Sequence, residues 1–398
     1  MSWPSVKLGN ILKVTSGFAF KSKEFVDKGH PIIRISNIDG SKVNLKNAAN
    51  VAATAVEGKE RFLVKSGDIL IAMSGATTGK LGVVPEGIDK VYLNQRVGKF
   101  HFDSNEICSK YLYYFLLSDI CQTHINSLAV GAAQPNISGG QLESIEIPLP
   151  PLQVQKQIAA VLEKADTLRG QCQQMEQELN TLAQSVFLDM FGDPVKNPKG
   201  WEVKKFKDIC SSQLGKMLSA KAKQGTNPKK YLRNANVRWR QIELHDLLEM
   251  DFNEKEMKKF TLEYGDLLVC EGGDVGRCAI WKNELSDCYY QKALHRVRVN
   301  NEVVTPEYIQ EYFYWMSKLG GLSASVSEVT FSHLTAAKMA ELKVPVPPIE
   351  LQVKYKEKIE ALNSQLTQTN ASSHDFSDLF DSLMQRAFKG ELDLKDVA

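Results

Sequence analysis

The sequence has no long hydrophobic run and no secretory leader, and each absence excludes a class of protein. Its longest apolar stretches, such as ILIAM at residues 69–73, are far shorter than the roughly 20 residues that span a bilayer. The first residues lack the basic start, apolar core and small-residue cleavage site of a signal peptide. We therefore expect a cytoplasmic protein without a membrane segment.

The cysteines and histidines lack the spacing of disulfide frameworks and metal sites. The seven cysteines are odd in number and include no C-x-x-C pair, which favours reduced thiols. The seven histidines are scattered along the chain. We expect no bound metal and no cofactor.

Net charge is almost absent, with 49 basic and 47 acidic residues. A protein that neutralises phosphates usually shows a basic excess, so this balance counts mildly against a nucleic-acid binder. Basic residues can still gather on one face, and a partner subunit can supply part of the phosphate contact.

Catalytic motifs are also missing. Residues 73–81, MSGATTGKL, approach a phosphate-binding loop, but only three residues separate the glycines, and Leu81 stands where Ser or Thr would bind magnesium. The sequence has no H-E-x-x-H, no G-x-S-x-G and no Asn-Pro-Pro-aromatic motif of an amino-methyltransferase. We therefore expect a chain that is not an enzyme.

What the sequence does contain is an internal repeat of about half its 398 residues. PPLQVQ from Pro150 returns 197 positions later as PPIELQ from Pro347, and GDIL from Gly67 returns as GDLL from Gly265. A period this long is far beyond a solenoid unit, so each copy is a domain with its own connector. Tandem duplication predicts pseudo-two-fold symmetry, which suits a target with two half-sites.

The first connector, residues 152–191, predicts one long helix. It has no proline and a single glycine, and it begins after a Pro-Pro pair. Its apolar residues follow alternating steps of three and four, the heptad pattern of a coiled coil. The predicted seam consists of Ile158, Val161, Ala165, Leu168, Cys172, Met175, Leu179, Leu182 and Val186.

The second connector predicts a weaker seam with a polar centre. It runs through Ile359, Leu362, Leu366, Thr369, Ser373, Phe376, Phe380, Leu383 and Ala387. The sequence TNASSH predicts an interruption near Asn370. We expect the two seams to pack on each other, because each would otherwise expose an apolar stripe. A helix of 40 residues is about 60 Å long. The alternative is that the helices only dimerise the protein.

The remaining segments predict two mixed α/β (α+β) domains of one fold. Short β-rich runs such as HPIIRI, GDILIAM and RVGKFHF are broken by turn residues, and CSKYLYYFLLSDICQ is helical in pattern. The predicted boundaries are 1–150 for the first domain, 151–192 for the first helix, 193–347 for the second domain and 348–398 for the second helix.

Several segments combine basic, amide and aromatic side chains, the chemistry that binds phosphates and base edges. In the first domain the candidates are Phe20, Lys21, Arg34, Asn37, Thr78, Lys80, Asn94, Gln95, Arg96, Gln134 and Asn136. In the second they are Lys216, Arg233, Asn236, Arg238, Arg240, Arg277, Gln291, Lys292 and Arg296. RNANVRWR at residues 233–240 is the strongest segment. Any one of these residues alone could be an ordinary surface or turn residue.

Taken together, these motifs resemble the specificity subunits of type I restriction-modification systems over essentially the whole chain. The resemblance rests on IPLPPLQVQKQI at 147–158, VPVPPIELQVKYKEKI at 344–359, GDIL and GDLL, FGDP after the first helix, and AFKGEL near the end. It implies two target-recognition domains, each binding half of a bipartite site in double-stranded DNA, and two antiparallel spacer helices that set the gap.

The same resemblance implies the partners. Two methyltransferase subunits would bind this chain, and restriction subunits would join through the complex. S-adenosylmethionine would belong to those partners. The bases contacted do not follow, since recognition domains are the variable part of such families. The alternatives are a specificity subunit of a related restriction-modification class, a coiled-coil scaffold without DNA recognition, and an enzyme whose motif is not visible.

Overall fold

The chain packs into two units, each containing one globular domain and half of both long helices. The computed structural model describes residues 3–129, 135–220, 222, 224–324 and 333–394. Unit 1 comprises Met1–Gln174 and Asn370–Ala398, and unit 2 comprises Met175–Thr369. These units cut both helices, whereas the boundaries predicted from the sequence follow the helix ends. The predicted domain limits therefore stay a prediction.

Two small sheets form the globular part of unit 1. The first has the order β2-β9-β6-β7, all antiparallel, and consists of β2 (Leu12–Ser16), β9 (Val97–Phe102), β6 (Ile69–Ala72) and β7 (Leu81–Val83). The second has the order β3-β5-β4-β8 and consists of β3 (Phe25–Val26), β5 (Ala49–Val51), β4 (His30–Ile33) and β8 (Tyr92–Leu93), with β4 and β8 parallel. A further pair joins β1 (Ser5–Lys7) to β10 (Glu146–Pro148), just before the first long helix.

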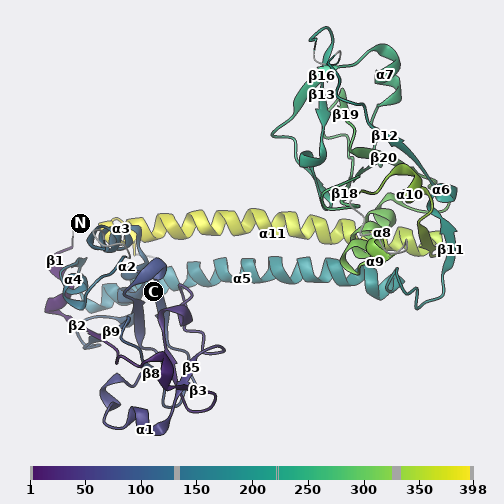
Figure 1. Cartoon of the computed structure of the whole chain (residues 1–398). Coiled ribbons are helices and arrows are strands. Elements are labelled where there is room, and N and C mark those ends of the chain that lie inside the picture. The colour runs from purple at the N-terminus through teal and green to yellow at the C-terminus, as the bar shows by residue number, and fades with distance from the viewer. Residues whose placement is uncertain (1–2, 130–134, 221, 223, 325–332, 395–398) are drawn as a thin grey trace. The chain divides into compact units, whose positions relative to one another are not determined.

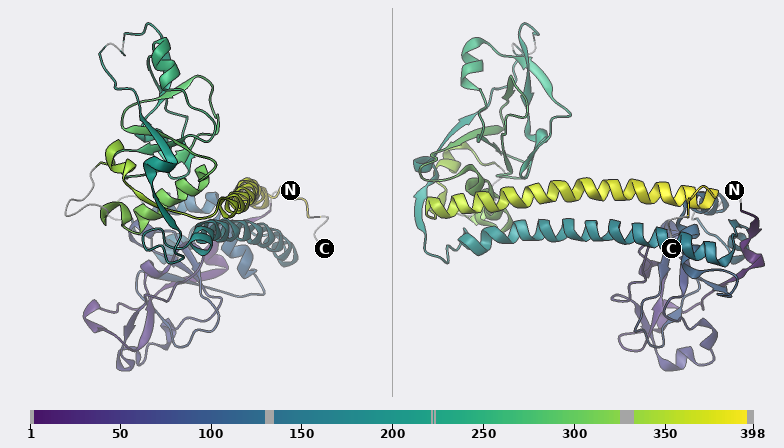
Figure 2. Two further views of the ribbon diagram at one scale, coloured as in Figure 1. Left: turned by 90° about the vertical axis from the view of Figure 1, so that its right-hand side faces the viewer. Right: turned by 180° about the vertical axis from the view of Figure 1, so that it is seen from behind.

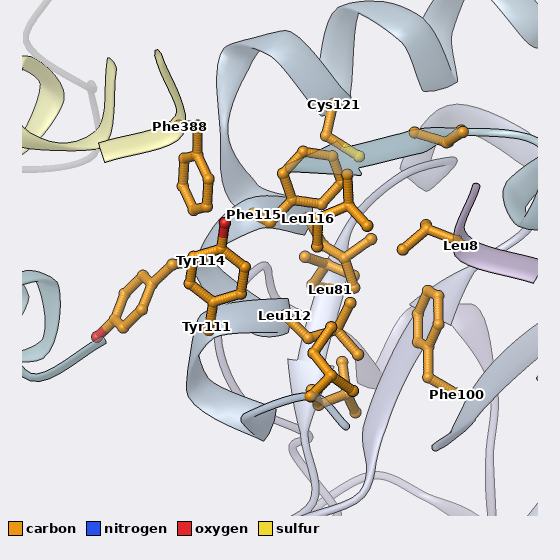
Figure 3. Packing of buried hydrophobic residues seen from close by; sticks show 14 of the residues in the cluster. Leu8, Leu81, Phe100, Tyr111, Leu112, Tyr114, Phe115, Leu116, Cys121 and Phe388 are labelled. Atoms are coloured by element: carbon orange, nitrogen blue, oxygen red, sulfur yellow. The ribbon is translucent and has the colours of Figure 1, made fainter. Parts of the chain in front are cut away.

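Helices cover the first sheet of unit 1 and enclose its main core. They are α2 (Ser109–Leu117), α3 (Asp119–Leu128) and α4 (Gly139–Glu143), while α1 (Ala53–Val56) packs with the second sheet through Val56. The predicted single helix at CSKYLYYFLLSDICQ is two helices, because Ser118 ends α2 and its hydroxyl accepts a hydrogen bond from the Cys121 amide. Figure 3 shows Tyr111, Phe115 and Leu116 of α2 packed with Phe100 of β9 and with Phe388 from the second long helix.

Unit 2 repeats this order of strands and helices. Its first sheet is β12-β20-β17-β18, made of β12 (Cys210–Leu214), β20 (Leu294–Val299), β17 (Leu267–Cys270) and β18 (Cys278–Ile280). Its second sheet is β16-β13-β19, made of β16 (Leu248–Asp251), β13 (Pro228–Leu232) and β19 (Cys288–Tyr290). Further strands are β11 (Glu202–Lys205), β21 (Lys343–Val346) and the hairpin of β14 (Val237–Arg238) and β15 (Gln241–Ile242). The helices are α6 (Phe206–Ile209), α7 (Glu254–Lys259), α8 (Pro306–Lys318), α9 (Gly321–Ala324) and α10 (Ala336–Ala340). The prediction of two mixed α/β domains of one fold is confirmed.

The connectors are the continuous helices α5 (Leu152–Phe191) and α11 (Ile349–Lys389), the two longest ribbons of Figure 1. The interruption predicted near Asn370 is wrong. Asn, Ser and Thr cost a helix at most about 0.7 kcal/mol each relative to Ala, which packing overrides. Thr369 is buried and Ser373 half-buried, so the polar centre takes part in the packed face. In the part of the chain that the structure describes, no helix is both long and apolar enough to cross a membrane.

A buried glutamine in the first turn attaches each helix to its own domain. In unit 1, Gln155 accepts a hydrogen bond from the Cys108 amide at 2.9 Å and donates to the Pro150 carbonyl at 2.9 Å. In unit 2, Gln352 accepts from the Thr305 amide at 3.0 Å and donates to the Pro347 carbonyl at 2.8 Å. The repeated Pro-Pro-x-x-x-Gln motif is therefore the joint between helix and domain.

Within each unit α5 and α11 lie side by side and run antiparallel (Figure 2). In unit 1 the guanidinium of Arg169 on α5 lies 4.2 Å from the ring centre of Phe380 on α11. In unit 2 the rings of Phe187 on α5 and Tyr355 on α11 are in edge contact at 5.8 Å. Residues late in α11 thus meet the early half of α5, and residues early in α11 meet its end.

The buried row of α5 differs in part from the predicted seam. Ile158 and Ala165 are buried as predicted, Val161, Leu168 and Leu179 are half-buried, and the fully buried Leu162 was missed. Leu182 is wrong as a seam residue, because its side chain is 47% exposed. Met175 is 52% exposed, but its sulfur accepts a hydrogen bond from Thr369 of α11 at 3.7 Å, so it lies at the margin of the helix contact. The less exposed positions of α5 keep the heptad spacing through Leu162, Arg169 and Glu176. Two of these residues are charged, so a pattern built from apolar residues alone places part of the seam on the adjacent, more exposed face of the helix. In α11 the predicted Leu362, Leu366, Phe376 and Leu383 are all half-buried.

This correction gives a matched pair of variants. We expect Leu162→Glu to lower the free energy of unfolding by at least about 3 kcal/mol, because it buries an unpaired carboxylate and removes a core side chain. Leu182→Glu should change it by no more than about 0.5 kcal/mol. Thermal unfolding followed by circular dichroism at 222 nm compares the two, and equal losses of stability would contradict the observed row.

All seven cysteines are free thiols, and five of them are buried. Burial raises the pKa of the Cys121 thiol to about 12 and that of Cys270 to about 11. These thiols stay protonated and unreactive at neutral pH.

Candidate nucleic-acid interface

In unit 1, main-chain hydrogen bonds gather the predicted contact segments at one place. The Gln95 amide donates to the Phe18 carbonyl at 2.9 Å, and the Asn94 amide donates to the Ile33 carbonyl at 3.0 Å. The Met73 amide donates to the Arg96 carbonyl at 2.9 Å. The Gly75 amide donates to the Pro135 carbonyl at 2.9 Å. We call the surface formed by residues 16–21, 33–37, 73–80, 93–96 and 135–136 the polar edge of unit 1.

In unit 2, equivalent main-chain hydrogen bonds join the equivalent segments, and we call this set of bonds in each unit its main-chain frame. The Lys216 amide donates to the Tyr290 carbonyl at 3.1 Å, and the Gln291 amide donates to the Leu232 carbonyl at 3.0 Å. The Glu271 amide donates to the Ala293 carbonyl at 2.9 Å. We call residues 214–219, 232–240, 271–277, 290–293 and 333–334 the polar edge of unit 2.

A glycine permits the close approach of two segments in each frame. A Cβ on Gly17 would lie 2.1 Å from the Leu93 carbonyl oxygen, and a Cβ on Gly215 would lie 2.4 Å from the Gln291 carbonyl. No side chain fits at either position. The S-G-F and L-G-K turns therefore hold the flanking polar residues against the 94–96 and 291–293 turns.

The predicted contacts of unit 1 divide into exposed and structural residues. Lys21, Lys80, Gln95, Arg96 and Asn136 are exposed, and Arg34, Thr78 and Asn94 are half-buried. The predicted contact by Phe20 is wrong, because its ring is buried in an aromatic cluster at 5.0 Å from Phe18. Gln134 lies outside the described residues.

Asn37 and Asn236, both predicted as contacts, stabilise a turn instead. Asn37 Oδ1 accepts from the Arg34 amide at 3.0 Å, and Asn236 Oδ1 accepts from the Arg233 amide at 3.0 Å. Both amides are buried. Base contact by these two residues is contradicted, because their hydrogen-bonding atoms face the main chain. The arginine that opens each turn stays at the polar edge.

Several predicted contacts of unit 2 are engaged within the protein. Lys216 Nζ pairs with Glu256 at 2.6 Å and is almost fully buried. Arg296 donates to the Thr261 carbonyl at 2.5 Å, and Arg277 donates to the Asn234 carbonyl at 3.0 Å. Lys292 is exposed and Gln291 is half-buried.

Arg240, in the segment that the sequence favoured most, has a structural role. Its guanidinium forms a bidentate ion pair with Glu311 of α8, whose carboxylate is buried, and stacks 4.0 Å from the ring centre of Tyr314. Burial by itself would lower the pKa of this guanidinium, but the hydrogen bonds and charge of Glu311 hold it above its ordinary value. Neighbouring Trp239 donates to Asp274 at 2.8 Å. The predicted DNA contact by Arg240 is therefore corrected on the ground of this ion pair and stacking. Arg238 is exposed and pairs with Glu243 at 3.1 Å.

Sequence reasoning missed His333, which takes the place of Asn136. Asn136 pairs with Ser74 through a β-bridge, and His333 pairs with Gly272 in the same way. The repeat offset of 197 links Asn136 to His333 and would have found it.

Polar atoms without a protein partner concentrate at both polar edges. Among the described residues these include Ser74 Oγ, Thr77 Oγ1 and Arg34 Nε in unit 1, and Arg233 Nε, Asn234 Oδ1, Arg277 Nε and Gln291 Oε1 in unit 2. These atoms are buried, and buried polar atoms without a protein partner are rare in folded proteins and are often satisfied by ordered water. No group of three or more potential metal ligands occurs in the described ranges.

Two copies of one α/β domain, each with a polar edge and a long helix, define a class of tandem-domain proteins. The family model described as "Type I restriction modification DNA specificity domain" matches residues 2–181 and 198–373. The chain belongs to this family and is a specificity subunit of the type I restriction-modification class.

Individual relatives agree with this assignment. The EcoKI specificity subunit of Escherichia coli K12 is 25% identical over 419 residues, covering 98% of this chain and 89% of the relative. The MjaVIII specificity subunit of Methanocaldococcus jannaschii is 32% identical over 169 residues, which cover 42% of this chain and 40% of that subunit. The crystal structure of the S subunit from M. genitalium has a TM-score of 0.59 at 16% identity, with 97% and 96% coverage. At that identity the structural likeness shows the fold alone.

Proposed function

We propose that this chain recognises a bipartite site in double-stranded DNA, with one polar edge for each half-site. The observation that carries the proposal is that both units build the same main-chain frame and place different side chains on it. Asn94, Gln95 and Arg96 of unit 1 correspond to Gln291, Lys292 and Ala293 of unit 2. Amides and guanidiniums at such positions distinguish adenine from guanine in the major groove.

In the same proposal, the chain directs its partner subunits to the DNA site and catalyses no reaction itself. It would bind two methyltransferase subunits, which hold S-adenosylmethionine, and restriction subunits would join through them in the cytoplasm. The names of the relatives and the lack of catalytic motifs in the sequence support this division of labour. The helices α5 and α11, 40 and 41 residues long, would set the gap between half-sites.

Selection from random duplexes tests the proposal. The chain, purified with methyltransferase subunits, should enrich a motif of two short blocks at a fixed gap. Arg96→Ala should change the preferred bases of one block and Lys292→Ala those of the other, each by about 1–3 kcal/mol of discrimination.

Two outcomes would contradict the proposal, and a third would contradict the choice of residues. Absence of any enriched motif favours a coiled-coil scaffold. Cleavage or methylation of DNA by the purified chain alone favours an enzyme. Loss of assembly in both alanine variants would contradict the assignment of these residues to DNA.

A further inference from the structure

The two polar edges share one turn and differ in the charge around it. In each unit an arginine opens an R-x-x-N turn, Arg34 in unit 1 and Arg233 in unit 2. The Asn37 side chain donates to the Asn44 carbonyl at 3.0 Å, and the Asn236 side chain donates to the Glu243 carbonyl at 3.1 Å. These matching bonds align the two turns at an offset of 199 residues.

This alignment shows that unit 2 has acids where unit 1 has amides. Asn44 corresponds to Glu243, and Asn47 corresponds to Asp246. Both acids are used in ion pairs. Asp246 accepts from Arg233 Nη2 at 2.5 Å, and Glu243 accepts from Arg238 Nε at 3.1 Å. The chain thus carries a charged and a neutral version of one turn.

The predicted cationic contacts follow the same division. In unit 2, four of the seven pair with a carboxylate: Lys216 with Glu256, Arg233 with Asp246, Arg238 with Glu243 and Arg240 with Glu311. Of the other three, Arg277 and Arg296 donate to main-chain carbonyls, and Lys292 is exposed. In unit 1, over the described residues, none of the four is in an ion pair: Lys21, Arg34, Lys80 and Arg96. The cations of the two edges therefore differ in what they offer to a phosphate.

An arginine that is already neutralised gains little from a phosphate. The incoming anion must compete with the carboxylate and is repelled by it, so few counterions are released from the DNA. An unpaired arginine at the same position gains the full attraction and releases counterions on binding.

We propose that the two recognition surfaces divide DNA binding unequally. The edge of unit 1 supplies most of the salt-dependent affinity for the phosphates through Arg34 and Lys80. At the edge of unit 2, Asp246 and Glu243 neutralise Arg233 and Arg238, so this edge contributes more to base selection than to non-specific affinity. This inference rests on the proposed function.

Reciprocal exchange of one residue tests it. Asp246→Asn gives unit 2 the residue of unit 1 and keeps a hydrogen-bond acceptor for Arg233, and Asn47→Asp does the reverse. The affinity of the complex with methyltransferase subunits is measured against salt, on its selected duplex and on a random duplex of equal length. The slope of log affinity against log salt should steepen by about 1 for Asp246→Asn and weaken by about 1 for Asn47→Asp.

A second matched pair keeps the test independent of folding at Asp246. Arg34→Gln should weaken the slope by about 1, and Arg233→Gln by less than half as much. Equal effects of these two variants, or an unchanged slope in both exchange variants, would overturn the inference while DNA binding stands. Failure of the unaltered complex to bind any duplex would overturn the proposed function itself.

Discussion

Arg240→Ala is expected to lower the free energy of unfolding of unit 2 by about 3 kcal/mol, a large effect for one surface arginine. The substitution leaves the buried Glu311 carboxylate without its bidentate partner and removes the stacking on Tyr314. At about 2–4 °C for each kcal/mol in a unit of this size, the thermal transition of unit 2 should fall by about 6–12 °C. Differential scanning calorimetry measures this directly.

Arg238→Ala is the matched control for that experiment. Arg238 lies two residues earlier in the same hairpin, is 52% exposed and forms one ion pair, with Glu243. Surface pairs of this kind contribute at most about 1 kcal/mol, so its transition should hardly move. A double variant with Glu311→Gln should recover part of the stability lost in Arg240→Ala, because the buried charge is removed. Equal shifts for Arg238 and Arg240 would contradict the structural role of Arg240.

Gln352→Ala is expected to destabilise unit 2 to a similar extent, by about 3 kcal/mol. It leaves the Thr305 amide and the Val303 and Pro347 carbonyls without partners, and each buried orphan costs about 1–3 kcal/mol. Chemical denaturation followed by circular dichroism gives the loss. Gln365→Ala, on the exposed face of the same helix, should stay within about 0.5 kcal/mol of the unaltered protein.

Gln352→Glu separates hydrogen bonding from packing. It keeps an acceptor for Thr305 but loses both donations and adds a buried charge. It should therefore be no more stable than the alanine variant. If Gln352→Ala unfolds at the same denaturant concentration as Gln365→Ala, the joint does not carry the stability assigned to it.

Local patterns in the sequence predicted the elements of this fold well. The duplicated Pro-Pro motif located the start of α5 to the residue, because a proline pair fixes its own neighbours. The same reasoning misplaced part of the seam on α5. Residues such as Arg169 belong to the buried row through contact with Phe380, 211 positions away, and no local pattern records that contact.

The candidate site was predicted less completely, and the reason is again distance along the chain. Arg240 looked like a contact residue because the sequence around it is basic, but Glu311 lies 71 positions further on. Asn37 and Asn236 looked like base contacts because amides serve both purposes, and only the fold shows their bonds to the main chain. Gly17 and Gly215, which allow the polar segments to approach, carry no side chain for a pattern to detect.

The hydrogen bonds of the buried glutamine fix how each domain is rotated about the axis of its long helix. Since Gln155 fixes the first turn of α5 to its domain, the azimuth of that domain around the helix axis is determined by the phase of the helix. One residue inserted into α5 turns everything beyond it by about 100° and advances it by about 1.5 Å. Seven residues restore the azimuth to within about 20°. Insertions of eleven residues restore it equally well and insertions of eighteen residues restore it fully, whereas most other lengths turn whatever follows in the helix.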